Sequence, residues 1–283
     1  MIDETAREIR EMQTHSSSVV AVKASRALAE LLDREFATTE EYLRSLEHNG
    51  KALRRANPSH ASLQNAVRAI VDEVTAAEPE TVATAKELTD ARIEAVVERI
   101  EAGTRRAARN GADRLADGAT ILTHDYSSTV LSALEQAVED GKRFEVLVTE
   151  ARPRYIGRKT VRALSDVDGV EPTLITDAAA GHHLEACDRV VVGMTCIVDR
   201  TLYNRVGTFP IAAAADRLGV PVTALGAASK LVTGGFVFEN EFRPGSEVMP
   251  EPAEGFAVSN PAYDATPVDL LEEVVTDDGP QTF

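Results

Sequence analysis

The sequence contains no tryptophan, only two cysteines and no apolar run of the length that a membrane-spanning helix needs. Two cysteines, Cys187 and Cys196, are too few for the disulfide frameworks of small secreted domains. A helix that crosses a bilayer takes roughly 18 or more apolar residues. The acidic start at Asp3 and Glu4 also lacks the positive flank of a secretion signal. These absences predict a cytoplasmic protein that does not bind membranes.

Lysine is scarce, and the basic residues together are outnumbered by the acidic ones. Only six of the 30 basic residues are lysines, and 46 acidic residues give a formal net charge of −16. A surface of that sign repels the phosphate backbone of nucleic acids, so we expect no direct nucleic-acid binding. An acid-rich, lysine-poor surface suits solubility at high salt. We therefore interpret it as a solvated, halophilic surface rather than as an acidic docking site.

The 283 residues are enough for one large domain or two ordinary ones. Residues 79–116 are predicted to form a long charged helix that ends at Gly118. The Asn57-Pro58 step separates earlier helices, because a residue before proline avoids helical backbone angles. One of them has a single apolar face, made of Leu63, Ala66, Val67, Ile70, Val71 and Val74. Residues 1–117 are thus predicted to be a helical domain.

From residue 118 onward, short apolar segments alternate with helical patterns. The strand-like segments are 120–123, 144–148, 172–175, 189–192 and 221–225, and the helices are predicted over 128–140, 157–167 and 208–218. Gly141, Gly169 and Gly219 follow these helices, where glycine takes the left-handed conformation at little cost. Strands that alternate with helices of this length form a parallel sheet with helices on both faces. Residues 118–283 are therefore predicted to be a doubly wound α/β domain.

In an open α/β sheet, ligands bind beyond the carboxyl ends of the strands, so the residues there are the first candidates for a site. Ser127 and Ser128 follow the first strand at the start of a helix, where hydroxyls and free backbone N–H groups suit an anion. An ordinary N-cap explains the same two residues. Both interpretations are open at this point.

The second strand is followed by five cations within eleven residues: Arg152, Arg154, Arg158, Lys159 and Arg162. A guanidinium presents two parallel donors that match the geometry of a phosphate. Such a run is unusual in a chain with a net charge of −16. It either binds a phosphorylated ligand or forms a solvated helix face that balances acidic neighbours.

Two further strand ends carry candidate anion ligands. Asn204 and Arg205 come just before Thr208 at the start of a helix, and a glycine between them lets the backbone approach a ligand. The positive end of the helix dipole also favours negative charge there. Lys230 follows the strand-like segment 221–225, but a single lysine is weak evidence alone.

The cysteines and histidines offer weaker chemistry. Cys196 lies just past a strand, where a nucleophile is conceivable, but the sequence supplies no base near it and a small buried thiol is the commoner case. His182 and His183 are adjacent, so on a helix their side chains point about 100° apart. No other residue at a suitable spacing completes a metal site with them. We therefore expect neither a metal nor a cofactor.

Seven motifs in one order resemble the initiation factor 2B alpha/beta/delta family. They are ILTH at 121–124, TEARP at 149–153, LITDA at 174–178, VVVG at 190–193, NRVGT at 204–208, Lys230, and NPAYDATP at 260–267. The family includes regulatory subunits of a nucleotide-exchange factor and two sugar-phosphate isomerases, which act on ribose 1,5-bisphosphate and methylthioribose 1-phosphate. The resemblance covers nearly the whole chain. It implies a helical N-terminal domain, a Rossmann-like C-terminal domain, and a homodimer formed through the latter.

The chain departs from the isomerases where the chemistry would be carried. Asp125 stands in place of their cysteine, and Thr195 in place of the aspartate of a Gly-Ala-Asp segment. The two arginine motifs that bind phosphate in the family appear here as His15-Ser16-Ser17 and Asn57-Pro58-Ser59. The predicted ligand-binding residues are Ser127, Ser128, Arg152, Asn204, Arg205, Thr208 and Lys230.

These departures lead to an expectation about function. A carboxylate differs from a thiol in basicity and softness, and each lost acid or base costs about 10²–10⁴-fold in rate. We therefore expect a non-catalytic, initiation-factor-2B-like regulatory subunit with no catalytic residues. The resemblance suggests the alpha subunit of initiation factor 2 as a protein partner, and a small phosphorylated metabolite or nucleotide as a ligand. The alternative is an aldose–ketose isomerase that acts on ribose 1,5-bisphosphate or a relative.

Overall fold

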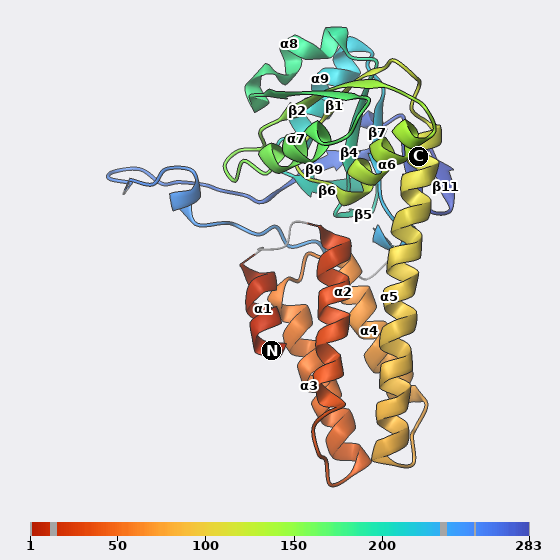
Figure 1. Cartoon of the computed structure of the whole chain (residues 1–283). Coiled ribbons are helices and arrows are strands. Elements are labelled where there is room, and N and C mark those ends of the chain that lie inside the picture. The colour runs from red at the N-terminus through yellow and green to blue at the C-terminus, as the bar shows by residue number, and fades with distance from the viewer. Residues whose placement is uncertain (1, 12–15, 233–236, 252, 283) are drawn as a thin grey trace. The chain divides into compact units, whose positions relative to one another are not determined.

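The protein is seen in a computed structural model that describes residues 2–11, 16–232, 237–251 and 253–282 (Figure 1). The chain divides into two compact units, Met1–Ala102 and Gly103–Phe283. The division falls inside helix α5 (Val82–Asp113), whereas the sequence analysis set the domain boundary after that helix. Helical hydrogen bonds are local, so one helix can contribute residues to two separate cores.

The first unit is built from helices α1 (Ile2–Arg10), α2 (Ser17–Ala27), α3 (Thr39–Ala56), α4 (Ala61–Ala76) and the first part of α5, with the 3₁₀ turn η1 (Leu28–Leu31) after α2. Their apolar faces form a single core. The predicted apolar face of α4 is confirmed, because all six of its residues are buried. Tyr42 is fully buried, and its hydroxyl donates to Thr89 Oγ1 at 2.7 Å, which satisfies the one polar atom of that side chain.

The second unit is organised around a seven-stranded sheet in the order β11-β10-β7-β4-β1-β2-β3. Its strands are β1 (Thr120–Thr123), β2 (Phe144–Thr149), β3 (Val170–Ile175), β4 (Arg189–Gly193), β7 (Val222–Leu225), β10 (Glu273–Thr276) and β11 (Gly279–Gln281). All neighbours pair in parallel except β10 with β11. The predicted doubly wound α/β fold is confirmed.

Helices cover both faces of this sheet, because side chains alternate along each strand. Ile121 packs in a core with α6 (Ser128–Glu139), α7 (Gly157–Ser165) and the end of α5. Its neighbour Leu122 belongs to a second core, with α8 (Ala180–His183) and α9 (Thr208–Leu218). The 3₁₀ turns η2 (Asp177–Ala179) and η3 (Leu184–Ala186) flank α8 (Figure 1).

A second, smaller sheet was not predicted. It contains β8 (Leu231–Val232), β5 (Cys196–Val198), β6 (Thr201–Arg205) and β9 (Tyr263–Pro267), in the order β8-β5-β6-β9. Strands of two or three residues are shorter than the alternating patterns by which strands are recognised. Between β8 and β9 the described residues, 237–251 and 253–262, protrude from the sheets and form short turns, such as η5 (Gly245–Glu247), and an isolated bridge between Phe242 and Pro261 (Figure 1).

Some predicted helix ends were wrong and others are confirmed. Helix α5 ends at Asp113, so Gly118 does not cap it; instead the Gly118 N–H donates to the Arg143 carbonyl at 2.9 Å beside β1. Gly141 and Gly219 do follow α6 and α9 with positive φ, as predicted. No helix among the residues described is long and apolar enough to cross a membrane.

Candidate functional site

The strand order reverses its direction beside β1. From β1 the chain adds β2 and β3 on one side, and β4 then returns to the other side of β1. This reversal is a topological switch point, which is where open α/β sheets bind ligands. Asp125 follows β1 and Thr195 follows β4, so the two residues that replace the isomerase acid–base groups both come from strands at this point.

His124 ties the end of β1 to its neighbours. It is 1% exposed, with Nδ1 at 2.6 Å from Thr149 Oγ1 and Nε2 at 2.9 Å from the Val206 carbonyl. A carbonyl only accepts, so Nε2 carries the proton and the Thr149 hydroxyl donates to Nδ1. Gly207 has a φ of 110°, and a Cβ there would lie 2.6 Å from His124 Cε1, so glycine is required at that position. Both ring nitrogens are thus engaged in holding the site together.

Asp125 is an under-bonded buried carboxylate. Its side chain accepts from Arg205 Nε at 3.3 Å through Oδ2, while Oδ1 has no hydrogen-bond partner among the described residues. Its backbone φ of 68° is left-handed, a conformation that non-glycine residues adopt at a cost and that recurs at functional sites. The Asp125 carbonyl is held by the Thr160 hydroxyl at 2.7 Å. The carboxylate is therefore fixed in place with one oxygen available.

Arg205, on β6, is the counter-charge to Asp125. It is 7% exposed, its Nη1 has no partner among the described residues, and its guanidinium lies 5.1 Å from the centre of the Tyr263 ring. Burial is the largest single influence and lowers the pKa of Arg205, but the charges of Asp125, Tyr263 and Glu241 and the hydrogen bond to Asp125 together raise it. Burial raises the pKa of Tyr263 to about 12, against the opposing charge of Arg205. Arg205 is thus a fixed cation whose Nη1 is available to donate a hydrogen bond.

Lys230 is buried at the end of β7 with its Nζ donating to the Met194 carbonyl at 2.9 Å. Burial lowers its pKa to about 8, and the nearby Cys196 thiol acts in the opposite direction. Cys196 itself is fully buried, which raises its pKa to about 12. Cys196 is therefore a small buried thiol, as the sequence analysis favoured, rather than an exposed nucleophile.

Ser127 serves as the N-cap of α6, because its Oγ accepts from the Val130 N–H at 3.3 Å. The same hydroxyl packs against the end of β4, where a Cβ added to Gly193 would lie 2.5 Å from it. Ser128 is the first residue of α6 and is partly exposed. Both serines therefore lie at the carboxyl edge, beside the switch point. Anion binding by them stays a prediction.

The start of α9 does not offer the free amides that the sequence suggested. Asp264 Oδ2 accepts from the N–H groups of Gly207 at 2.6 Å and Phe209 at 3.0 Å. Asn204 donates to Thr208 Oγ1 at 3.1 Å, and this hydroxyl donates to the Arg205 carbonyl. The two residues are occupied in fixing the turn behind Arg205. An anion at this helix start would have to compete with the chain's own carboxylate.

The cation run after β2 splits into two groups. Arg158 pairs with Glu150 at 3.2 Å, and Lys159 lies 3.9 Å from the centre of the Tyr126 ring, so both serve local packing. Arg152 is exposed, and its guanidinium donates to the Val248 carbonyl at 3.2 Å. Only Arg152 and Arg154 of the run line a cavity that Arg205 also lines.

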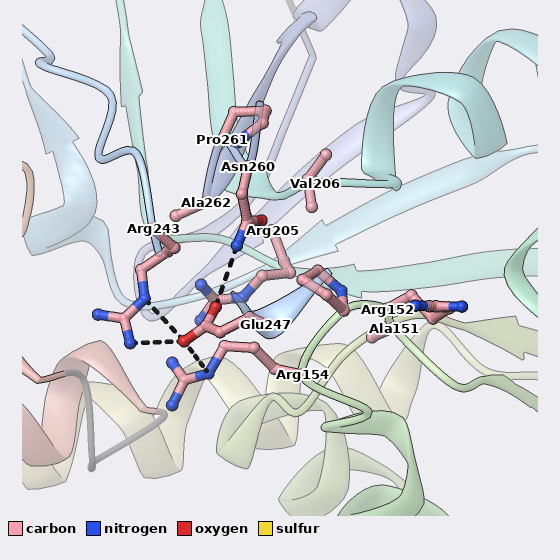
Figure 2. Close-up of a pocket in the computed structure, with 11 residues that line it drawn as sticks. Ala151, Arg152, Arg154, Arg205, Val206, Arg243, Glu247, Asn260, Pro261 and Ala262 are labelled. Atoms are coloured by element: carbon pink, nitrogen blue, oxygen red, sulfur yellow. Dashed lines mark hydrogen bonds and ion pairs between the residues drawn. The ribbon is translucent and has the colours of Figure 1, made fainter. Parts of the chain in front are cut away.

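Figure 2 shows that cavity, and half of its polar lining was not predicted from the sequence. Arg243, Glu247 and Asn260 come from the segment between β8 and β9 and face Arg154 and Arg205. Asn260 opens the C-terminal motif and Arg154 belongs to the cation run, so both had a signal. Nothing in the local sequence singles out Arg243 or Glu247.

Two other sequence observations concern the first unit. Ser16 and Ser17 begin α2 and are buried, whereas His15 lies outside the described residues. In the Asn57-Pro58-Ser59 segment, Asn57 Oδ1 accepts from the Ser59 N–H at 3.1 Å.

The chain is an α/β protein with buried charges at the switch point of a doubly wound sheet. The sequence model of the Initiation factor 2 subunit family matches residues 13–282, and the chain belongs to that family. The resemblance noted from the motifs is therefore confirmed.

Named relatives narrow the comparison. A ribose 1,5-bisphosphate isomerase from Haloterrigena turkmenica is 34% identical, over 97% of this chain and 88% of the relative. One from Archaeoglobus fulgidus is 32% identical, over 98% of this chain and 88% of the relative. Among solved structures, a translation initiation factor eIF-2B from Pyrococcus horikoshii has a TM-score of 0.82 at 26% identity, covering 99% of this chain and 96% of its own. The 5-methylthioribose 1-phosphate isomerase of that organism has a TM-score of 0.81 at 25% identity, covering 99% and 83%.

The expectation of a non-catalytic regulatory subunit was wrong. Relatives at 30–34% identity over nearly the full chain are named ribose 1,5-bisphosphate isomerase, which favours the isomerase alternative. The error lay in treating a carboxylate as unable to take the role of a thiol. A carboxylate is an effective base for moving a proton next to a carbonyl, as the glutamate of triosephosphate isomerase does. The translational role, and with it the alpha subunit of initiation factor 2 as a partner, has no support over the isomerase.

Proposed function

We propose that the protein is an aldose–ketose isomerase whose substrate is a phosphorylated pentose of the ribose 1,5-bisphosphate class. The observation that carries the proposal is the buried Asp125 carboxylate, held at the switch point by Arg205 with Oδ1 unpartnered among the described residues. An isomerase of this kind needs a base that is positioned but not fully hydrogen-bonded. The names of the relatives support the same reaction class.

In the proposed reaction the sugar ring opens at the bond between C1 and the ring oxygen, which takes up a proton, and Asp125 takes the proton from C2 and returns it to C1. The C2 hydroxyl gives up its proton and becomes the ketone carbonyl, so protons balance, no electrons enter or leave and no redox partner is required. Negative charge develops on the C2 oxygen as the enolate forms. The buried Arg205 guanidinium, with Nη1 unpartnered among the described residues, is the group that would stabilise it.

The remaining predicted residues have supporting roles in this proposal. Ser127 and Ser128, at the start of α6, would receive a substrate phosphate, because helix N-termini favour anions. Lys230 would add positive charge behind β4, since its Nζ bonds the Met194 carbonyl. Asn204 and Thr208 would hold the turn that carries Arg205. Thr195 has no acid–base role in this scheme.

The experiment is conversion of ribose 1,5-bisphosphate to its ketose isomer by the purified chain, followed by NMR in deuterated water. It should be run at low and at high salt, because the acidic composition predicts halophily. Turnover above roughly 1 s⁻¹, with deuterium entering the product, is expected. The absence of turnover at every salt concentration would refute the function. Turnover without deuterium would keep the reaction but exclude Asp125 as a solvent-exchanging base.

We also propose that the chain forms a homodimer through its second unit. Large apolar side chains are exposed there, including Phe209 at 43%, Phe242 at 68% and Phe256 at 58%. Exposed apolar groups of this size are common at contact surfaces. One chain has a mass of 30.4 kDa, and light scattering on the purified protein should give twice that mass. A monomer at all concentrations would contradict the proposal.

A further inference from the structure

The cavity in Figure 2 contains an anion that belongs to the chain itself, the carboxylate of Glu247. Arg243 donates to it through Nη2 at 2.7 Å and through Nε at 3.2 Å. Asn260 Nδ2 donates to Glu247 Oε2 at 3.2 Å. Arg154 Nε lies 4.0 Å from Glu247 Oε1, the oxygen that Arg243 also contacts. Donors from three places in the sequence therefore converge on one carboxylate, as they would on a bound oxyanion.

Little space is left around that carboxylate. The free volume in the cavity is about 10 Å³, which is room for roughly one water molecule. A phosphate cannot enter while Glu247 stays in place. The donors nevertheless have the composition that phosphates require, namely two guanidinium groups and an amide.

The cluster has an unused hydrogen-bond donor on its inner side. Arg205 lines the same cavity, is buried, and has an Nη1 without a hydrogen-bond partner among the described residues. A buried donor without an acceptor costs about 1–3 kcal/mol, more for a charged group. Burial lowers the pKa of Arg154, and the charges of Arg205 and Arg243 lower it further. Asp125 and Glu241 already pair with Arg205 and Arg243, so a phosphate would add acceptor oxygens, including one for Arg205 Nη1, rather than missing charge.

Glu247 is carried on a turn at the surface. The turn η5 (Gly245–Glu247) contains no buried residue, and the next residue, Val248, is 37% exposed. Withdrawing the turn would break the bonds that the Pro244 and Val248 carbonyls accept from Asn260 and Arg152. Arg243 would remain anchored, because its N–H donates to the Asn260 carbonyl at 2.8 Å. The donors can therefore stay in place while the carboxylate leaves.

We propose that Arg154, Arg243 and Asn260 form a phosphate subsite that Glu247 occupies until a phosphorylated ligand displaces it. The inference rests on the proposed function in one respect: the phosphate admitted there is the second phosphate of the bisphosphate substrate. Arg205 lines the same cavity and donates to Asp125, which precedes the start of α6 in the chain. Glu247 thus acts as an internal competitor that favours ligands with a doubly charged group.

The test is titration calorimetry of the full chain with inorganic phosphate, comparing the wild type with Glu247→Gln. The glutamine keeps the shape of the side chain and removes the competing charge. We expect the affinity for phosphate to rise about tenfold, which corresponds to roughly 1.4 kcal/mol. Equal or weaker binding by Glu247→Gln, or no phosphate binding by either protein, would overturn the proposal.

Glu241→Gln is the matched control. Glu241 also accepts from Arg243, at 3.1 Å, but it does not line the cavity, so its variant should bind phosphate within about twofold of the wild type. If Glu247→Gln does not fold, Arg154→Met answers the same question. It should weaken phosphate binding about tenfold, because it removes a donor and leaves the Arg243–Glu247 pair intact. Unchanged binding by Arg154→Met would sink the subsite.

Phosphate binding is measured without turnover, so the two proposals can fail separately. Tighter phosphate binding by Glu247→Gln in a chain without isomerase activity would support the subsite and contradict the proposed function. Turnover of ribose 1,5-bisphosphate with no change in phosphate affinity would support the function and contradict the subsite.

Discussion

The two edges of the seven-stranded sheet both bury charged side chains, but they satisfy them differently. At the amino edge, Glu273 begins β10 and is 4% exposed, and its carboxylate accepts from Arg114, Arg189 and Thr223. At the carboxyl edge, Asp125 has one partner, at 3.3 Å, and an oxygen with none among the described residues. A buried charge with a full set of donors stabilises a fold, whereas one left short is available to a ligand. The comparison suggests that Glu273 at the amino edge stabilises the fold and that Asp125 at the carboxyl edge is available for catalysis.

The largest effect is expected at the carboxyl edge. Asp125→Asn removes the proposed base and should lower kcat/KM for ribose 1,5-bisphosphate by about 10²–10⁴-fold. The asparagine can keep the left-handed backbone and the bond from Arg205, so the fold should survive. Steady-state kinetics with a circular dichroism melt checks both parts. Activity within a few-fold of the wild type would show that the carboxylate is not the base.

The amino edge should respond in the opposite way. Glu273→Gln leaves Arg189 and Arg114 without their buried counter-charge, and should reduce the free energy of unfolding by about 2–3 kcal/mol. This is below the range for a fully buried pair because the side chain of Arg114 is 47% exposed. Urea unfolding measures it, with kcat/KM per folded molecule expected to stay unchanged. A larger loss of stability in Asp125→Asn than in Glu273→Gln would break the comparison.

The pH dependence of stability gives a subtler distinction. The folded-state pKa of Lys230, about 8, lies below its ordinary value of 10.5, so between these values the unfolded chain binds more protons than the folded one. The contribution of Lys230 to stability therefore rises with pH through this window. From pH 7 to pH 9.5 the wild type should gain about 2 kcal/mol relative to Lys230→Met. Parallel urea-unfolding profiles for the two proteins would mean that Lys230 is not desolvated.

The smallest effect is expected for a charge pair that belongs to neither edge. Arg200 and Asp269 pair with side chains 58% and 73% exposed. Solvent and salt screen such pairs, so Arg200→Ala should change the free energy of unfolding by less than about 1 kcal/mol. A loss as large as that of Glu273→Gln in the same urea titration would indicate that exposure does not separate the two classes of ion pair.

The fold could be predicted from sequence wherever one local pattern decides the outcome. The apolar periodicity of α4, and the alternation of helices with the strands β1, β2, β3, β4 and β7, gave the right elements. The small sheet could not be predicted, because β5 and β8 have three and two residues and exist only through pairing with distant segments. The early end of α5 was missed for a related reason. Gly118 lies just before β1, where its N–H donates to the Arg143 carbonyl, and no local sequence pattern predicts that bond.

The candidate site divides along the same line. Arg205 and Lys230 were predicted as ligand-binding residues from motifs next to them in the chain, and both are buried. Glu247 was not predicted, since its role depends on Arg243 and Asn260 meeting it in space. The free amides expected at the start of α9 were also a misjudgement, because Asp264, on another strand, accepts from them. Sequence motifs predict which polar groups lie at a strand end. They do not predict which distant side chains form hydrogen bonds with those groups.

The central claim is that the under-satisfied carboxylate at the carboxyl edge performs the chemistry. The most direct test is the turnover of ribose 1,5-bisphosphate by the wild type, Asp125→Asn and Glu273→Gln, each normalised to its folded fraction. The account predicts turnover above roughly 1 s⁻¹ for the wild type, a loss of at least about 100-fold in Asp125→Asn, and an unchanged rate in Glu273→Gln. No turnover by the folded wild type, or an equal loss in both variants, would contradict it.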